Sequence, residues 1–486
     1  MWALIASYWP HILAAVTTLM AAVAAAHAAM TKDEVRAAIG WVGVILLSPF
    51  VGTLLYAVAG INRIRRTAVA TERGAARHEV PEHASFDADS AAVASRFGRR
   101  FAALKTAGDR ITHHALTTAN SIAMFHGGDE AYAAMIEAIS AARRSILMET
   151  YIFDRDPIGL RVAQALIDAA NRGVEVRILI DAVGARYSVP SIVGYLRERG
   201  VRTCVFNGRI ITGLRLPYAN LRTHRKILVV DGTIGFVGGM NIRQGFTAEF
   251  AGENSARDTH FRVEGPVIAD IFAIAAEDWF FASGERLNGD SWRIALETAG
   301  EPGSAVFMRA LPSGPDANLE ANHKMLMCAF SIARRSIRIM SPYFLPDREL
   351  ISALTTAARR GIEIDIVVPS ANNLVLVDRA MRAQFDQVVR NSCRVWRSSG
   401  PFNHSKLLVV DSMWAFVGSS NLDPRSLRLN FEIDLEVLDA GVAKAIEARI
   451  ESAMASAREV TLESLRARPF LGRLIDRILW LGSPYL

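Results

Sequence analysis

Two histidine–lysine pairs with the same spacing are the residues of this chain best suited to chemistry. One residue separates His224 from Lys226, and one residue separates His404 from Lys406. On a strand, this spacing places both side chains of a pair on one face. An imidazole titrates near neutrality and can act as a nucleophile or as an acid–base, and a compact ammonium makes a point contact with a phosphoryl oxygen. The pairs therefore predict chemistry on a phosphodiester.

Each pair begins a longer motif, His-x-Lys-x4-Asp-x6-Gly-x2-Asn, which occurs twice. The other motif residues are Asp231, Gly238, Gly239 and Asn241 in the first copy, and Asp411, Gly418, Ser419 and Asn421 in the second. We expect the aspartates to fix a turn, Gly239 and Ser419 to let the backbone approach a ligand, and the asparagines to add an amide donor there. A lone His-x-Lys is usually surface decoration, but two full copies are not expected by chance. The chain has only 6 lysines against 49 arginines, and two of the lysines occupy this position.

The chain around the motifs is also duplicated, which predicts two similar halves. Matching helical patterns end in Arg172-Gly173 and Arg360-Gly361, and alternating apolar residues follow each of them. Glycine after an arginine-rich last turn is typical of a helix end, and a period of two indicates a strand. Strand–helix–strand order predicts an α/β fold of two pseudo-symmetric domains, each a mostly parallel sheet flanked by helices. We expect these domains over residues 116–295 and 303–460.

Two uncharged runs predict an N-terminal hairpin of transmembrane helices over residues 1–62. The runs Trp9–Ala29 and Ala37–Ile61 are each long enough to span the hydrocarbon, and Pro49 is tolerable inside a membrane helix. A cleaved signal peptide is the alternative for the first run, although the basic n-region is missing. Residues 63–115 are expected to form a juxtamembrane linker with some helix. The arginines at the start of the linker indicate, by the positive-inside rule, a multi-pass protein of the inner cell membrane with its domains in the cytoplasm.

The duplicated motif resembles the hallmark of the phospholipase D superfamily. More narrowly, the chain is similar to bacterial cardiolipin synthases over nearly its whole length, through the stretches Gly60–Arg66, Glu149–Phe153, Asn220–Lys226, Gly238–Ile242, Arg257–His260, Ser341–Phe344, Asn421–Ser426 and Asn430–Glu432. Ser405 departs from the alanine that is more frequent there, and Pro401–Asn403 is also unusual. Both departures bear on substrate preference.

The resemblance implies a two-step phosphoryl transfer, without metal or other cofactor, where the two halves meet. His224 would attack the phosphodiester and His404 would act as acid–base, with Lys226 and Lys406 at the phosphoryl oxygens. The motif residues Asp231 and Asp411 complete the implied catalytic set. Asp258 and Glu432 match the acids that orient the histidines in that family, or they are ordinary surface carboxylates. The implied reaction converts two phosphatidylglycerol molecules into cardiolipin and glycerol.

Composition agrees with a lipid substrate and narrows the alternatives. Hydrophobic residues make up 51%, the mean hydropathy is +0.19, and a net charge of +6 fits an anionic partner such as phospholipid. Three distant cysteines exclude a disulfide scaffold. A hydrolytic phospholipase D would share every catalytic residue. Two spans argue against a phosphodiester nuclease and against a nucleic-acid partner, and two intact motifs argue against a non-catalytic scaffold.

The C-terminal tail, residues 461–486, has apolar residues at helical spacing with arginines on other faces. This pattern predicts an amphipathic helix. Such a helix lies in an anionic membrane interface or docks on its own domain, and the sequence favours neither.

Overall fold

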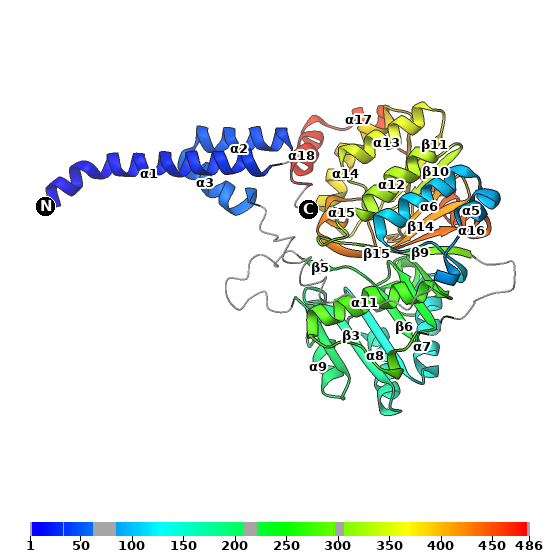
Figure 1. Cartoon of the computed structure of the whole chain (residues 1–486). Coiled ribbons are helices and arrows are strands. Elements are labelled where there is room, and N and C mark those ends of the chain that lie inside the picture. Colours follow the sequence, from blue (N-terminus) through cyan, green and yellow to red (C-terminus); the bar gives the residue numbers. More distant parts are fainter. Residues whose placement is uncertain are drawn as a thin grey trace. The chain divides into compact units, whose positions relative to one another are not determined.

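The structure is a computed structural model that describes residues 2–32, 34–61, 84–207, 221–294, 296 and 306–483. The chain forms two compact units, an N-terminal unit within residues 1–65 and a main body that contains both motif copies (Figure 1). Each unit is considered by itself. The predicted arginine cluster at residues 63–77 and the start of the predicted linker lie outside the described residues.

The N-terminal unit is helical, but its second apolar run is not one continuous helix. Helix α1 (Trp2–Thr31) contains the stretch Tyr8–Thr31, which is long and apolar enough to cross a membrane, with a mean hydropathy of 1.9. The second run is divided into α2 (Val35–Leu47), α3 (Pro49–Leu55) and a π-turn at Tyr56–Gly60. The expectation that Pro49 would sit inside a continuous span is wrong. Proline has no backbone N–H and restricts the residue before it, so the helix ends at Leu47 and a new one begins at Pro49.

The three helices of the N-terminal unit nevertheless pack on one another. Ala21 and Ala28 of α1, Ile45 of α2 and Tyr56 are buried together. The hydroxyl of Tyr56 lies 2.7 Å from Nδ1 of His27, which joins α1 to the end of the second run. The chain therefore folds back on α1, with one arm long enough to span a bilayer and the other broken.

In the main body, the first half follows the predicted order of strands and helices. After α5 (Ser90–Phe97) and α6 (Arg99–Thr112), its elements are β1 (Thr117–His126), α7 (Gly128–Ala141), β2 (Ser145–Thr150), α8 (Pro157–Asn171), β3 (Glu175–Asp181), α9 (Ile192–Arg197), β4 (Arg202–Phe206), β5 (Arg222–Thr223), β6 (Ile227–Val230), β7 (Ile234–Gly238), α10 (Ala248–Ala251), β8 (Thr259–Glu264) and α11 (Val267–Ser283). Helices α7 and α8 pack against one another, and the long apolar α11 packs on the strands.

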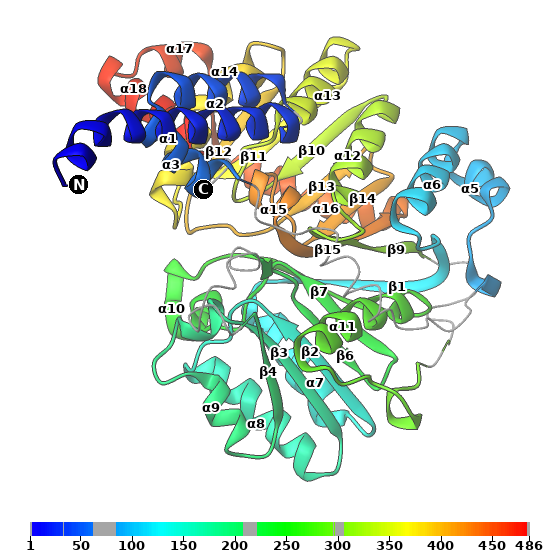
Figure 2. The same cartoon turned by 60° about the vertical axis from the view of Figure 1, so that its left-hand side comes forward.

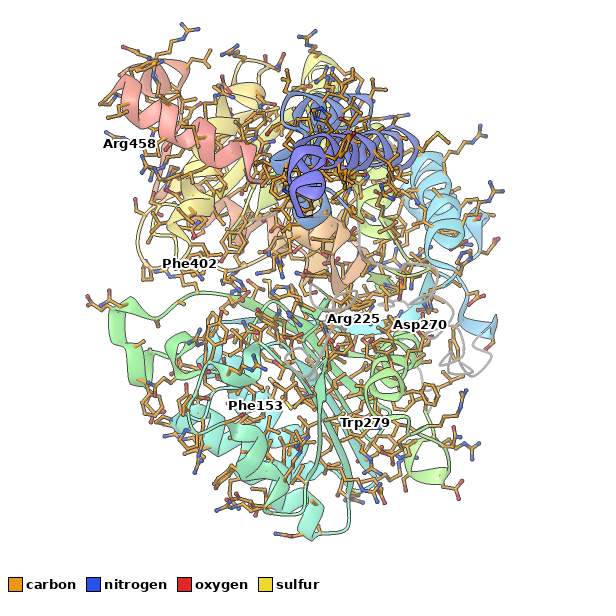
Figure 3. The ribbon with its side chains drawn as sticks, turned by 90° about the vertical axis from the view of Figure 1, so that its left-hand side faces the viewer. Phe153, Arg225, Asp270, Trp279, Phe402 and Arg458 are labelled. Atoms are coloured by element: carbon orange, nitrogen blue, oxygen red, sulfur yellow. The ribbon has the colours of Figure 1, made fainter. Side chains whose placement is uncertain are left out.

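The second half repeats this order. Its elements are β9 (Val306–Ser313), α12 (Ala321–Ile332), β10 (Ser336–Met340), α13 (Arg348–Arg359), β11 (Glu363–Pro369), α14 (Val375–Val389), β12 (Arg394–Ser398), β13 (Leu407–Val410), β14 (Trp414–Gly418), α15 (Pro424–Arg428), β15 (Asn430–Leu438), α16 (Ala440–Ala455), β16 (Ala457–Glu459), α17 (Leu462–Arg466) and α18 (Phe470–Leu481). Figure 2 shows the two halves one above the other. Figure 3 shows Phe153 and Trp279 inside the first half, and Arg225 closer to the junction.

One continuous sheet runs through both halves in the described part of the body. The strand order is β4-β3-β2-β6-β7-β8-β1 in the first half and β12-β11-β10-β13-β14-β15-β9 in the second, where β16 adds a further edge strand beside β12, and β1 pairs with β9. The two orders correspond strand for strand, so the halves are related by pseudo-symmetry. The duplication in the sequence thus becomes a duplication of the fold, joined edge to edge.

The sheet is mixed, and the prediction of a mostly parallel sheet is wrong. Parallel pairing is confined to β2-β3-β4, to β10-β11-β12 and to the short β5 beside β15, and the other described pairs are antiparallel. The motif explains the difference. Asp231 and Asp411 have positive φ angles of 53° and 55° in tight turns that join β6 to β7 and β13 to β14. So short a turn can only connect antiparallel neighbours, because parallel strands need a long crossover.

The described part of the predicted linker belongs to the second half. Phe101 and Leu104 of α6 are buried in the same core as Phe330 of α12. Arg100, also on α6, forms an ion pair with Asp411. The C-terminal tail docks too, because α18 packs along α14.

Candidate active site

Both motif histidines line a single cavity of about 740 Å³. His224 lies three residues before β6 and His404 lies three residues before β13, so they take the same position in the two halves, and both His-x-Lys pairs lie just outside the strands on which they were expected. The backbone binds each histidine to the opposite half: His224 N–H donates to Phe431 O at 2.8 Å, and His404 N–H donates to Arg257 O at 2.7 Å. The pairing of β5 with β15 lies next to the first of these bonds. The junction between the halves therefore places the two imidazoles at one cavity.

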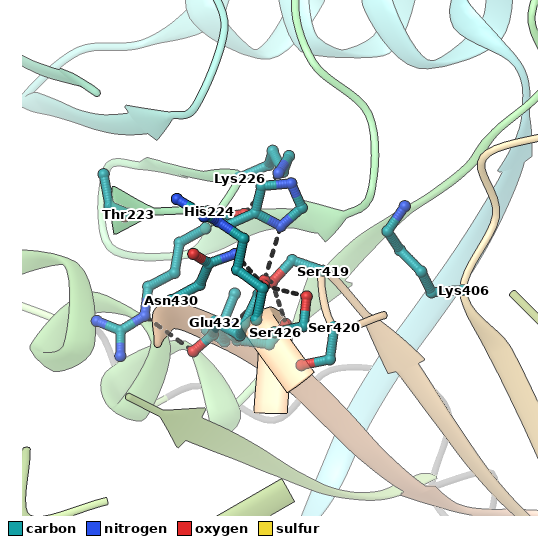
Figure 4. A network of polar contacts seen from close by, with 12 residues as sticks. Thr223, His224, Lys226, Lys406, Ser419, Ser420, Ser426, Asn430 and Glu432 are labelled. Carbon is teal, nitrogen blue, oxygen red and sulfur yellow. Dashed lines mark hydrogen bonds and ion pairs between the residues drawn. The ribbon is translucent and has the colours of Figure 1, made fainter. Parts of the chain in front are cut away.

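Each imidazole is held by a carboxylate from the other half. His224 Nδ1 lies 2.9 Å from Glu432 Oε2, and His404 Nδ1 lies 2.8 Å from Asp258 Oδ2 (Figure 4 shows the first pair). Both carboxylates are fully buried. Asp258 and Glu432, which occupy matching positions in the sequence, thus each hold the histidine of the other half. Neither is a surface carboxylate.

The two acids stay ionised in spite of their burial. Burial alone would raise the pKa of Glu432, but the electrostatic attraction to the His224 ring, the hydrogen bond from that ring and the charge of Lys226 bring the pKa below its usual value. For Asp258, burial is likewise outweighed by His404 and Lys406, and its pKa is lowered. An ionised carboxylate only accepts hydrogen bonds, so Nδ1 of each imidazole carries the proton. The other ring nitrogen, Nε2, is then left with a lone pair.

The imidazoles themselves are neutral at pH 7. Burial, reinforced by Lys406, lowers the pKa of His404 to about 4 against the opposing effect of Asp258. Burial also lowers the pKa of His224, although Glu432 opposes this. A neutral ring with a fixed Nδ1 proton is the form of histidine that can attack phosphorus through Nε2.

The two motif lysines are buried beside the imidazoles and do not line the cavity. Lys226 Nζ donates to His224 O and Lys406 Nζ donates to His404 O, both at 2.6 Å. Burial lowers the pKa of Lys226 to about 7 and that of Lys406 to about 8. Each of the two lysines lowers the pKa of both histidines. The two ammoniums therefore act on one electrostatic site.

The motif asparagines line the cavity, as the sequence led us to expect. Asn241 Oδ1 accepts a hydrogen bond from Ile152 N–H at 3.2 Å, which leaves its amide nitrogen for other contacts. Asn421 is also buried at the cavity, and its Oδ1 has no hydrogen-bond partner among the described residues. Asn421 thus has a polar group that a ligand could satisfy.

Gly239 and Ser419 make room for the orienting acids and do not line the cavity, so their predicted role in substrate binding is not supported. A Cβ at Gly239 would lie 2.9 Å from Asp258 Oδ1 and 3.1 Å from Lys406 Cδ. Ser419 Oγ donates to Glu432 Oε2 at 2.6 Å. The small residue that we expected to admit a ligand instead admits the acid that holds the partner histidine.

The motif aspartates fix the start of the neighbouring strand, and neither lines the cavity. Asp231 accepts hydrogen bonds from the backbone N–H groups of Arg143, Arg144 and Ser145 at 2.7–3.0 Å. Asp411 accepts from Arg334, Arg335 and Ser336 in the same way. This agrees with the expectation that the aspartates fix the turn. Their place in the implied catalytic set is therefore structural, because neither carboxylate reaches the cavity.

The sequence did not predict that Arg225 and Ser405, the residues between His and Lys, would make polar contacts across the junction between the halves. Arg225 is fully buried, forms an ion pair with Asp278, and donates from Nε to Glu432 O at 2.9 Å. Ser405 lies 2.9 Å from Thr259 Oγ1, beside Asp258. Arg225 thus contacts the orienting acid of the opposite half at its backbone, and Ser405 contacts the residue next to the other acid. The departure at Ser405 was the only signal of this in the sequence.

The two ends of the cavity also differ in a way that the sequence did not reveal. His404 is surrounded by aromatic rings, with ring centroids at 5.7 Å to Phe402, 6.3 Å to Phe246 and 6.4 Å to Tyr343. His224 contacts one ring, Tyr151, and the cavity wall near it carries Arg222, Asp423 and Arg425. The unusual stretch Pro401–Asn403 thus supplies one of the aromatic rings against His404.

Among the described residues, one group of side chains is close enough together to hold a metal ion: His323, Asp347 and Glu349. None of them lines the cavity. His323 and Asp347 already bind each other at 3.0 Å, and Asp347 also caps helix α13 at Leu350 N–H.

Comparison with known proteins shows which family has these features. The chain matches the family described as "Cardiolipin synthase, PLD-like domain" over residues 135–268 and 326–454, and the description "Phospholipase_D-nuclease N-terminal" over residues 19–60. It is 30% identical over 455 residues to a cardiolipin synthase of Alkalihalophilus pseudofirmus, covering 92% of this chain and 88% of that one. It is 31% identical over 489 residues to cardiolipin synthase A of Pseudomonas fluorescens, covering 99% of both chains. The crystal structure of a phosphatidylserine synthase from Haemophilus influenzae superposes on 79% of this chain and 100% of its own, with a TM-score of 0.59 and 16% identity.

The duplicated motif on a shared sheet, with both histidines at one cavity, defines a member of the phospholipase D superfamily. Within that superfamily, the chain belongs to the bacterial cardiolipin synthases. It is a phosphatidyltransferase of phospholipid biosynthesis.

Proposed function

We propose that this cavity transfers a phosphatidyl group from one phosphatidylglycerol to another, giving cardiolipin and glycerol. The observation that carries the proposal is the pair of neutral imidazoles at one cavity, each held at Nδ1 by a buried carboxylate of the opposite half. Each half supplies a histidine and the acid that holds the other histidine. Both halves are therefore needed for each imidazole.

In the first step, His224 Nε2 attacks phosphorus and the bond to the head-group glycerol breaks. The glycerol oxygen takes a proton from His404, which must therefore be protonated when the step begins. Burial and the charge of Lys406 lower the pKa of His404 to about 4. An anionic phosphodiester next to this ring favours the imidazolium, so we expect the pKa to rise when substrate binds. The products of the step are a phosphatidyl-His224 intermediate and glycerol.

In the second step, His404 is neutral and removes a proton from the glycerol hydroxyl of a second phosphatidylglycerol. The resulting oxygen attacks phosphorus, the phosphorus–nitrogen bond breaks, and His224 is released with cardiolipin. Lys226, Lys406 and the amides of Asn241 and Asn421 would stabilise the charge that develops on the phosphoryl oxygens. Donors already fixed in a buried site are worth more than the same donors in water, which suits this function.

The assignment of His224 as nucleophile is part of the proposal. The two environments support it, because Glu432 has more donors fixing it than Asp258 has. Ser419 and Ser426 donate to Glu432 at 2.6 and 2.8 Å, in addition to His224. A firmly held acid keeps the attacking ring in one orientation and one tautomer.

We also propose that the N-terminal unit anchors the enzyme in the inner membrane, with the main body on the cytoplasmic side. The apolar length of α1 and the basic residues that follow the second run support this arrangement. The division into an N-terminal unit at residues 1–62, two domains at 116–295 and 303–460 and a C-terminal helix at 461–486 belongs to the same proposal, with α5 and α6 joined to the second domain.

The decisive experiment is incubation of the purified full chain in detergent with phosphatidylglycerol alone, without divalent metal. Cardiolipin and glycerol in equal amounts are the expected products. Phosphatidic acid as the only lipid product would mean that water is the acceptor and would refute the transferase. His224→Ala and His404→Ala should each abolish turnover while the protein remains folded, and a label from the lipid phosphate should map to His224.

A further inference from the structure

The exposed apolar side chains of the main body are not scattered. In its described residues, large hydrophobic side chains are exposed at Tyr187, Val189, Phe250, Leu374, Val375, Leu376, Phe470, Leu471, Leu474, Ile478 and Leu481. Eight of these eleven belong to two short stretches, residues 374–376 at the start of α14 and residues 470–481 on α18. Scattered single residues need no explanation, but a contiguous apolar surface marks a site of interaction.

Helix α18 is held on the body by the buried Asp476 and by Leu479 and Trp480, which pack against the core of the second half, and it turns another apolar stripe outward. Asp476 is almost fully buried, accepts from Arg379 Nε at 2.8 Å, and also pairs with Arg468. Phe470, Leu471, Leu474, Ile478 and Leu481 recur at intervals of about one helical turn, so they share one face. Packing alone would bury such a stripe. Here the ion pairs of Asp476 and the packing of Leu479 and Trp480 hold the helix with the stripe exposed.

Arginines flank the stripe. A groove between α14, α17 and α18 is lined by Arg466 and Arg473 together with Phe470 and Leu474. Arg466 and Arg473 are exposed, and neither has a carboxylate partner among the described residues. An apolar stripe bordered by unpaired arginines is the pattern of a helix that lies in an anionic membrane interface.

The same surface reaches the active-site cavity. Leu374, Val377 and Ser483 line the cavity together with His224 and His404, so the cavity wall includes the start of α14 and the residue shortly after α18. Tyr187, another exposed aromatic, lines the cavity as well. The apolar surface and the cavity mouth are therefore continuous.

We propose that residues 374–376 and the outward stripe of α18, the membrane-docking face, insert into the interface of an anionic bilayer and receive lipid into the cavity from there. The inference rests on the proposed lipid substrate. The arginines favour an anionic bilayer over an apolar protein partner, and the continuity with the cavity explains why the face lies where it does. A lipid can then move its head group to the histidines while its acyl chains stay against apolar side chains.

The test uses the full chain in nanodiscs and compares two substrates. In discs that contain phosphatidylglycerol, Leu474→Glu/Ile478→Glu should make cardiolipin at least about tenfold more slowly than the parent protein. In discs of phosphatidylcholine alone, its rate on water-soluble dihexanoyl phosphatidylglycerol should stay within about twofold. The matched control is Ala133→Glu/Ser140→Glu, which adds the same charge to exposed positions of α7 and should change neither rate. Equal loss on both substrates would mean that the stripe supports the fold or the site, and would overturn the proposal.

A second measurement does not depend on catalysis. An environment-sensitive fluorescent amino acid at position 471 should be quenched by lipids brominated on their acyl chains, and the same probe at position 133 should not. Absence of quenching at 471 would show that a second copy, another protein or the chain's own N-terminal helices cover the face, and would overturn the proposal. If the parent protein made no cardiolipin from either substrate, the proposed function would fail, and the quenching would still decide this inference.

Discussion

Replacement of Glu432 by glutamine tests the exchange of acids between the halves. The carboxylate of Glu432 accepts from His224 Nδ1 at 2.9 Å and Ser419 Oγ at 2.6 Å on one oxygen, and from Ser426 Oγ at 2.8 Å and Asn430 Nδ2 at 3.3 Å on the other. Glutamine has the same shape but no charge, so every one of these contacts is made with a neutral group. The effect on His224 depends on which way the new amide turns.

The surroundings favour one orientation of the glutamine amide. Asn430 can turn its own amide and Ser426 can rotate its hydroxyl, so both can accept from an NH₂ group at the Oε1 position. Ser419 already accepts from Ile433 N–H, which leaves its hydroxyl proton for the Oε2 position. We therefore expect the glutamine oxygen to face His224, and the Nδ1 proton of His224 to be kept.

The expected loss follows from this orientation. A hydrogen bond to a charged group contributes about 1.5–3 kcal/mol and one between neutral groups about 0.5–1.5 kcal/mol. The difference, about 1–1.5 kcal/mol, corresponds to a loss of about tenfold in kcat/KM. If the amide turned its NH₂ group to the ring, the tautomer would be reversed and the loss would approach about 10⁴-fold, as is known for such carboxylate-to-amide changes.

The assay is the rate of glycerol release from phosphatidylglycerol, with Asp434→Asn as a matched control. Asp434 lies two residues further along β15 and is equally buried, but it faces Ser420. Burial raises the pKa of Asp434 to about 8, so at pH 6.5 it is already protonated and the asparagine changes little. Full activity of Glu432→Gln, or an equal loss in Asp434→Asn, would refute the reasoning.

Three further predictions concern the lysines, Gly239 and Arg225. First, kcat/KM should fall as the pH rises through about 7 to 8. Lys226 and Lys406, with pKa values of about 7 and about 8, then lose the positive charge that stabilises the phosphodiester. A pH profile of kcat/KM that still rises at pH 9 would contradict this. Second, Gly239→Ala should lose most activity, because its Cβ would meet the Asp258 carboxylate at 2.9 Å. The control Gly194→Ala, where the added Cβ meets nothing within 4 Å, should release glycerol at the normal rate, and equal rates for the two variants would exclude the steric role. Third, Arg225→Met should lower the free energy of unfolding by about 3–5 kcal/mol, since it removes the guanidinium that pairs with the buried Asp278 carboxylate. The exposed Arg161→Met should not shift the thermal midpoint measured in detergent, and an unchanged midpoint for Arg225→Met would count against the buried ion pair.

Much of the site could be predicted because its chemistry is local in the chain. The histidine and lysine lie directly before a short strand, and the aspartate five residues after Lys226 lies in the turn that follows that strand, so all three belong to one short segment. The turn-fixing bonds of Asp231 and Asp411 agree with that expectation, because they depend on a short segment and its direct neighbour. Duplication in the sequence likewise indicated two similar halves.

Other predictions were wrong because the features concerned depend on which surfaces of the chain pack together. The pairing of strands was misjudged since apolar alternation does not distinguish parallel from antiparallel neighbours. The second apolar run was misjudged because composition permits a span where Pro49 divides the helix. Gly239 and Ser419 were misjudged because a need for small side chains says nothing about which group approaches them.

The sequence by itself determined the reacting groups and the duplication, because both are written in residue types and short spacings. Only the tertiary structure decided which acid holds which histidine. His224 and Glu432 are 208 residues apart, and His404 and Asp258 are 146 apart. Either acid could serve either ring as far as the chain order goes. The choice is made where β5 pairs with β15 and the histidine backbones bind the opposite half, because contacts between distant segments are fixed by packing and not by spacing.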